Sequence, residues 1–152
     1  MFRKGSEEPE LFKTYSKLIE LIPEIRMAVR KCIELDERSH IHDVTRIRVE
    51  RKFLREGMSL FQGKWTIDII YALSLLKEPY FNDIKRALPE INSRTLTDRL
   101  RFLEKRGIIN RNVETEQQVR VKYNLSEFGK GVYEMMFPFL FFFVIPKKYI
   151  KM

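Results

Sequence analysis

Apolar residues recur at helical spacing in three short segments between Gly63 and Gly107. They are Trp65, Ile69, Leu73 and Leu76 in the first segment, Phe81, Ile84 and Leu88 in the second, and Leu96, Leu100 and Leu103 in the third. Each set lies on one face of a helix, which predicts three amphipathic helices around a shared core. Asn92 is a suitable N-cap for the third helix, and Gly107 stands where a left-handed C-terminal cap belongs.

The period of the pattern then changes from helical to two. The apolar positions are Ile109 and Val113 in the first run, and Val119, Val121, Tyr123 and Leu125 in the second. This period predicts two half-buried strands, joined by a polar turn at residues 114–118. We expect Val119, Val121 and Tyr123 to face inward. Ser126 is placed to cap a last helix that runs towards Met136.

This order of elements predicts a mainly α fold with a small β-hairpin, of the α+β class. A helix-turn-helix followed by a hairpin is a winged helix, a fold that mostly binds duplex DNA. We assign it to residues 57–131. The helical segments on either side, residues 1–56 and 132–152, are expected to be dimerisation extensions.

The N-terminal extension has narrow apolar stripes and heavily charged backs. The pattern predicts one helix up to Ile22, a second that begins at Pro23 and carries Val29 and Cys32, and a third capped by Asp43. Such helices need a partner. With the phenylalanine-rich residues 137–145, they form apolar surface of the kind that marks an interface, so a homodimer is expected.

The chain has 152 residues, of which 44% are hydrophobic, and a net charge of +8. This size fits one domain with a helical extension, and the positive charge favours nucleic acid or an anionic membrane surface as partner. The most apolar run, residues 137–145, is shorter than the roughly 20 residues that a membrane-spanning helix needs. No signal peptide is visible, so we expect a cytoplasmic protein without a membrane span.

Candidate catalytic or metal-binding groups are sparse. His40 and His42 lie beside Asp43, but a metal site needs three or four convergent ligands, so a polar helix boundary is the preferred interpretation. Cys32 lies on an apolar stripe, which predicts a buried and unreactive thiol. No phosphate-binding loop or nucleophile motif occurs, and we therefore expect neither an enzyme nor a bound cofactor.

Five short motifs follow one another at defined spacing. They are Gly63, Lys64 and Trp65; Phe81 and Ile84; Ile91, Asn92, Ser93 and Arg94; Leu96, Thr97, Arg99 and Leu100; and Tyr123, Leu125, Ser126 and Gly129. Their joint order resembles the HxlR-type winged-helix transcriptional regulators of bacteria and archaea. The resemblance covers about half of the chain.

The resemblance implies a homodimer that binds a pseudo-palindromic operator, with the flanking helices forming the dimer. The sequence departs from the family in three places. Its leading region, residues 1–48, is longer than the family's usual N-terminal arm. Many relatives carry a redox-sensing cysteine shortly before the Gly-Lys-Trp motif, whereas residues 58–62 hold none, so thiol sensing is not carried over. The wing tip here is acidic, with Glu114 and Glu116, instead of neutral and proline-containing.

The third helix of the winged segment has a polar face opposite its leucines. Its candidates for DNA contact are Asn92, Ser93, Arg94, Thr95, Thr97, Asp98, Arg101 and Lys105. We expect Arg94 to pair with guanine, the two threonines to contact a thymine methyl or a phosphate, and Arg101 and Lys105 to contact the backbone. Asp98 either accepts from cytosine or, as we prefer, orients a neighbouring arginine. The alternative is a solvated charged face.

On the wing, Arg111, Arg120 and Lys122 are candidates for phosphate contact, or else form a charged strand edge that prevents aggregation. The favoured function is sequence-specific regulation of transcription through double-stranded DNA. An alternative is a winged-helix module that binds proteins of the transcription machinery. A third is association of the C-terminal tail with a membrane surface through its lysines.

Overall fold

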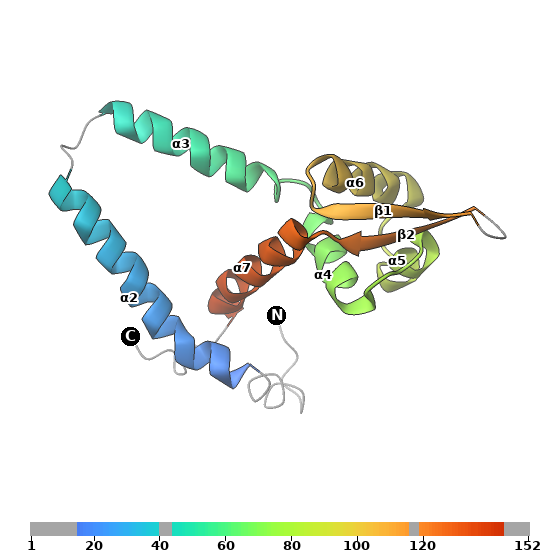
Figure 1. The fold of residues 1–152 in the computed structure, drawn as a ribbon, viewed down its shortest axis with the longest axis horizontal. Helices are drawn as coiled ribbons and strands as arrows, with labels where there is room; N and C mark the ends of the chain where they lie inside the picture. Colours follow the sequence, from blue (N-terminus) through green and yellow to red (C-terminus); the bar gives the residue numbers. More distant parts are fainter. Residues whose placement is uncertain (1–14, 40–43, 116–118, 145–152) are drawn as a thin grey trace. The chain divides into compact units, whose positions relative to one another are not determined.

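The computed structural model describes residues 15–39, 44–115 and 119–144 (Figure 1). Their elements are α2 (Ser16–Ser39), α3 (Val44–Ser59), α4 (Thr66–Leu76), α5 (Phe81–Ala87), α6 (Ser93–Lys105), β1 (Ile109–Glu114), β2 (Arg120–Leu125) and α7 (Glu127–Val144). The chain divides into two compact units, residues 45–136 and residues 1–44 with 137–152.

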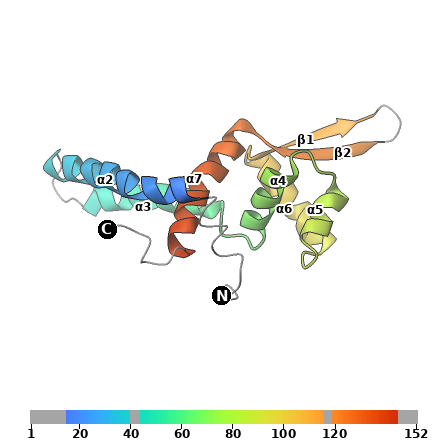
Figure 2. The same ribbon diagram turned by 90° about the horizontal axis from the view of Figure 1, so that it is seen from below.

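In the unit of residues 45–136, the short helices α4, α5 and α6 lead into an antiparallel hairpin, as a winged helix requires. The strands β1 and β2 run side by side (Figure 2), with Ile109 opposite Leu125 and Glu114 opposite Arg120. The α+β prediction is therefore confirmed. One inward residue was wrongly predicted: Val119 is 77% exposed, because it lies before the start of β2 at Arg120.

The core of this unit is built from the apolar stripes that the sequence pattern indicates. Its fully buried large side chains are Ile69, Ile70, Leu73, Ile84, Ile91, Leu96, Leu103 and Ile108. They come from α4, α5 and α6 and from the turns that follow α5 and α6. Burial of each such side chain contributes roughly 1.5–3 kcal/mol, so this cluster is the main source of stability for the unit.

Helix α4 begins one residue later than its apolar pattern indicates. Trp65 is the N-cap, with a left-handed φ of 75°, and is only half-buried, so the prediction that it belongs to the core is wrong. The ammonium of Lys64 lies 4.9 Å from the centre of its ring. Leu76, at the other end of the stripe, is 43% exposed, so Leu73 is the last buried residue of this stripe.

Helix α7 begins where Ser126 caps it. The Ser126 hydroxyl oxygen accepts from the amide of Gly129 at 2.9 Å, and the amide of Lys130 donates to the Ser126 carbonyl. The helix then continues through Pro138 to Val144, well past the predicted end near Met136. Phe137 and Phe141 pack on α2, and this burial compensates for the helical bond that Pro138 removes.

The second unit contains α2 and the end of α7. Ile22 and Phe141 are buried, and Tyr15, Leu18, Ile19 and Phe137 pack against them. The ring centres of Tyr15 and Phe137 are 4.9 Å apart. Pro23 was predicted to begin a helix, but it lies inside α2, since the apolar residues just before it share this cluster and keep the helix continuous.

The remaining apolar stripe of α2 is exposed in the single chain. Ile25 and Ile33 are 47% and 53% exposed, and Cys32 is exposed as well, so the prediction of a buried Cys32 is wrong. The reason is that the Ile22 cluster uses only the first turns of the helix.

In α3, Gly57 lies inside the helix, and the predicted cap Asp43 falls outside the described residues. No described helix is long and apolar enough to cross a membrane.

Candidate nucleic-acid interface

Helix α6 is fixed at its first turn by the predicted cap. The Asn92 side-chain oxygen accepts from the amide of Thr95 at 2.8 Å, and Asn92 has an extended backbone. This bond satisfies one of the amides that every helix leaves without a partner at its start. On the buried side, Leu96, Leu100 and Leu103 are at most 2% exposed. The opposite face is therefore held outward by packing and capping together.

The outward face of α6 carries most of the predicted site residues. Asn92, Ser93, Arg94, Asp98, Arg101 and Lys105 are exposed, and Thr95 and Thr97 are half-buried. The Thr97 hydroxyl donates to the carbonyl of Ser93 at 2.9 Å, so its methyl group is the part left for an outside contact. Three cations and one carboxylate remain on the exposed surface, which makes this face attractive to an anion.

Asp98 does not take the orienting role that the sequence suggested. Its carboxylate makes no ion pair with Arg94, Arg101 or any other cation in the described part of the chain. The helical spacing permits a pair of Asp98 with either arginine. All three side chains are exposed to solvent, however, and an ion pair at the surface contributes little to stability.

The end of α6 sets the direction of the wing. The amide of Gly107 donates to the carbonyl of Glu104, and the amide of Ile108 donates to that of Leu103, both at 2.9 Å. This pair of backbone hydrogen bonds around a left-handed residue is the Schellman motif, and Gly107 has the left-handed φ, 69°, that the motif requires. The turn leads directly into β1, so α6 and the wing share one fixed corner.

A cluster around Tyr80 holds the base of the wing. The Tyr80 hydroxyl donates to one carboxylate oxygen of Glu114 at 3.0 Å, and the ammonium of Lys122 lies 2.7 Å from the other oxygen. Tyr80 and Lys122 also form an isolated antiparallel bridge, and the amide of Tyr123 donates to the carbonyl of Pro79. The loop before α5 is thereby attached to the hairpin through both backbone and side chains.

The ionisation of this cluster follows from its contacts. The hydrogen bond from Lys122, and then that from Tyr80, hold the pKa of Glu114 below its ordinary value. The same bond to Glu114 raises the pKa of Lys122. Both groups therefore stay charged at neutral pH. Glu114 was expected to be a free acid at the wing tip; instead it lies in β1 and is engaged by two partners, whereas Glu116 falls outside the described residues.

The three predicted wing cations have different surroundings. Arg111 and Arg120 are exposed, and the Arg120 guanidinium lies 5.8 Å from the ring centre of Tyr80. Lys122 is half-buried and paired with Glu114, so its charge is already balanced within the wing. The structure thus separates two exposed cations, Arg111 and Arg120, from the paired Lys122. The alternation of residues along the strands could not make this distinction.

Sequence reasoning missed two residues that support this surface, Tyr80 and Arg99. The Arg99 guanidinium packs over Gly63, where an added Cβ would lie 2.1 Å from its Nη1, and it also lies 5.9 Å from the ring centre of Phe102. The Gly-Lys-Trp motif and α6 are therefore in direct contact. The signal for this contact was the co-occurrence of Gly63 and Arg99 in the motifs, but neither residue alone indicates it.

Within the described ranges, no group of three or more His, Cys, Asp or Glu residues could hold a metal ion. His40 and His42, which the sequence raised as candidates, lie outside those ranges.

Comparison with known proteins gives one consistent family. The family described as "HxlR-like helix-turn-helix" matches residues 60–140. The HTH-type transcriptional regulator YdzF of Bacillus subtilis is 33% identical over 79 residues, which cover 52% of this chain and 72% of that protein. An HTH-type transcriptional regulator of Methanothermobacter thermautotrophicus is 44% identical over 70 residues, which cover 46% of this chain and 53% of that protein.

Solved structures agree with this match. The reduced form of the transcriptional regulator YodB from B. subtilis has a TM-score of 0.51 and 30% sequence identity, over 54% of this chain and 79% of that one.

Proposed function

Because the chain belongs to the HxlR-like helix-turn-helix family, we propose that it regulates transcription by binding duplex DNA as a homodimer on a pseudo-palindromic operator. The observation that carries this proposal is the outward face of α6. It presents Arg94, Arg101 and Lys105 on a helix whose other face is fully buried. A helix held in this way can enter a major groove without losing its own packing.

The residues of this face have separate roles in the proposal. Arg94, two positions after the cap, pairs with guanine O6 and N7 through two of its guanidinium N–H donors. The Thr97 methyl contacts a thymine methyl, and the backbone amides near Ser93, at the helix N-terminus, donate to a phosphate oxygen. Arg101 and Lys105 lie further along the helix and neutralise phosphates. Asp98 remains available to accept from cytosine N4.

The wing contributes phosphate contacts through its exposed cations. Arg111 and Arg120 take this role, whereas Lys122 is engaged by Glu114 and contributes through the stability of the wing. A dimer places two recognition helices about 34 Å apart, one turn of B-DNA. Support for the dimer comes from the exposed apolar residues of the flanking helices, such as Val29 in α2, Phe53 in α3 and Phe143 in α7.

A binding experiment on two variants tests the proposal. Arg94→Ala should weaken binding to the selected operator by about 1–3 kcal/mol and remove the preference at one base pair. Lys105→Ala should weaken operator and random duplex alike and lower the salt slope by about one unit. Fluorescence anisotropy on both DNAs across a salt series measures these effects.

The outcomes separate the competing functions. If Arg94→Ala weakens both duplexes equally, α6 does not read the sequence. If neither variant changes binding to any duplex, the winged helix serves a protein partner instead, and the DNA-binding proposal is wrong.

A further inference from the structure

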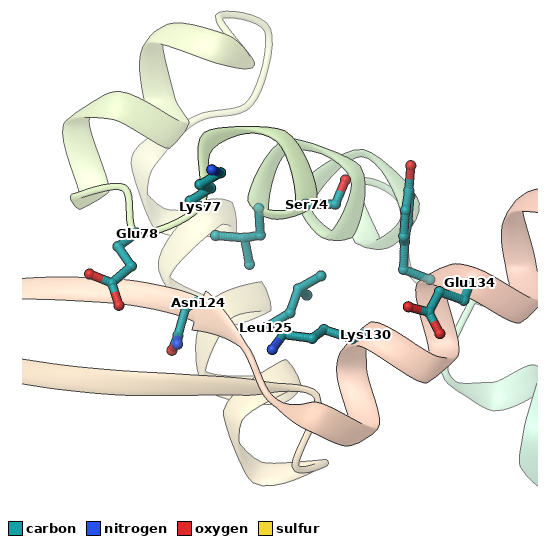
Figure 3. A pocket seen from close by; sticks show the side chains of 9 residues that line it. Ser74, Lys77, Glu78, Asn124, Leu125, Lys130 and Glu134 are labelled. Carbon is teal, nitrogen blue, oxygen red and sulfur yellow. The ribbon is translucent and has the colours of Figure 1, made fainter. Parts of the chain in front are cut away.

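A cavity of about 310 Å³ opens in the unit of residues 45–136, between α4, β2 and α7 (Figure 3). It lies within the size range of small-molecule sites. Leu73 of α4 and Leu125 of β2 line it and are almost fully buried, which gives the cavity an apolar floor. The proposed DNA-contacting residues of α6 are not among its lining residues. The cavity is therefore separate from the candidate DNA interface.

The rim of the cavity carries charged side chains of both signs. Lys77 and Glu78 lie on the side of the α4–α5 loop, and Lys130 and Glu134 lie on the side of α7 (Figure 3). Lys130 is paired with Glu127 at 2.5 Å, whereas Lys77, Glu78 and Glu134 make no ion pair in the part of the chain that the structure describes. A simple anion would meet two carboxylates here, and a simple cation would meet two ammonium groups.

Two local features at the cavity are not explained by packing. Asn124 lines the cavity, and its side-chain oxygen is buried without a hydrogen-bond partner among the described residues, which is uncommon for a buried polar atom. A half-turn about the last side-chain torsion, which is broad for asparagine, exchanges the amide oxygen and nitrogen, so either can face a ligand. Lys77 has a φ of 59° and a ψ of −98°, a conformation in which L-residues are strained. Both residues lie on the rim or wall of the same cavity.

We propose that this cavity binds a small apolar zwitterion of the α-amino-acid class. Its side chain lies on Leu73 and Leu125, its carboxylate meets a rim lysine, its ammonium meets a rim glutamate, and Asn124 gains the hydrogen bond that it lacks. A ligand with both charges and an apolar body matches a mixed rim over an apolar floor.

The position of the cavity makes the ligand a regulator, and this step rests on the proposed function. Its walls are a helix of the DNA-binding unit, a strand of the wing and the first turns of α7. A ligand that binds one arrangement of these three elements better than another shifts the protein towards that arrangement. DNA affinity then changes by the same factor as ligand affinity, because the coupling is reciprocal.

Titration calorimetry on the full chain without DNA tests the site. L-leucine, L-methionine and L-phenylalanine are the probes. 4-methylpentanoate and 3-methylbutylamine, which each lack one charge of leucine, are the controls. We expect at least one amino acid to bind at millimolar concentration or better, with both controls roughly tenfold weaker, since each lacks one charge-assisted bond. Equal binding of a control, or no binding by any of the three amino acids, overturns the proposal.

Variants locate the binding. Ser74→Phe fills the cavity without changing its charge, and Glu134→Gln removes one rim carboxylate. Both should weaken binding roughly tenfold, whereas Glu90→Gln, exposed and not part of the cavity, should not. If none of the cavity variants changes ligand binding, the ligand binds elsewhere and the proposal is wrong.

An anisotropy titration of operator DNA with and without ligand then tests the regulatory step. If DNA binding is intact but ligand-independent, the regulatory step is wrong and the proposed function stands.

Discussion

At the scale of single residues, Glu114 has an unexpected effect on the charge of the wing. Its carboxylate engages Lys122 and the Tyr80 hydroxyl, so it removes one cation from the surface available to DNA. Glu114→Gln should therefore release Lys122, strengthen binding to random duplex and increase the salt slope by about one unit. The salt dependence of anisotropy measures this change.

Tyr80→Phe is the matched control for this prediction. It removes the hydroxyl that donates to Glu114 but keeps the ion pair with Lys122, so the salt slope should stay unchanged. A slope that rises in Tyr80→Phe as much as in Glu114→Gln contradicts the assignment of the effect to Lys122.

The same carboxylate makes wing stability depend on pH. The pKa of Glu114 is lower in the folded protein than its ordinary value of 4.5, so its contribution is fully present above that value. As the pH falls through the lowered pKa, the carboxylate is protonated and the contribution is lost. Denaturant unfolding should show a smaller loss of stability below pH 4.5 for Glu114→Gln than for the natural chain. Parallel pH curves for the two proteins would contradict this.

Cys32 was expected to be inert because of burial, and that reason does not hold, since its side chain is exposed. The prediction that its oxidation does not switch DNA binding now rests only on its position, 31 residues before Gly63. Peroxide should leave operator binding of the natural chain and of Cys32→Ser equal. Loss of binding in the natural chain alone would reveal a thiol switch.

At the scale of elements, two glycines of α7 give a direct test of close packing. A Cβ at Gly129 would lie 1.9 Å from the carbonyl oxygen of Ile108, whereas a Cβ at Gly131 would meet nothing within 4 Å. Gly131→Ala should stabilise the protein by about 0.5–1 kcal/mol, because alanine favours the helix. Gly129→Ala should destabilise it, because the clash is with backbone. Chemical denaturation of both variants compares them, and equal effects would rule out this contact.

Elements formed by local signals could be predicted from the sequence, and elements that depend on distant packing could not. The Asn92 cap, the leucine stripe of α6 and the left-handed Gly107 each need only a few neighbouring residues, and all three were found. The continuity of α2 and α7 through their prolines depends on an aromatic cluster that joins the two ends of the chain.

The candidate site shows the same division. Periodicity located the outward face of α6, because burial of three leucines determines it. Periodicity could not find the contact of Tyr80 with Glu114, which are 34 positions apart, and it therefore treated Lys122 like the exposed cations beside it.

At the scale of the whole molecule, the exposed apolar stripe of α2 predicts a dimer. Light scattering at micromolar concentration should give twice the mass of the 18.4 kDa chain. Val29→Asp, which places a charge on the stripe, should shift the population towards monomer, because a buried unpaired charge is unfavourable. Lys31→Asp, on the exposed charged side of the same helix, is the control and should leave the mass unchanged. A monomeric mass for the natural chain would show that no dimer forms.

The hydrogen bonds that join the end of α6 to the start of α7 have a consequence for altering the DNA sequence that this protein would bind. The carbonyl of Ile108 accepts from the amide of Ser126 at 2.9 Å. The one proton of the Ser126 hydroxyl is shared between the carbonyls of Gly107, at 2.6 Å, and Ile108, at 3.1 Å. These bonds use backbone atoms and one serine, and none of the outward residues of α6. The base-reading side chains could therefore be exchanged for those of another regulator while the joint is retained. Under the proposed function, such a graft would recognise a new half-site with the original half-site spacing.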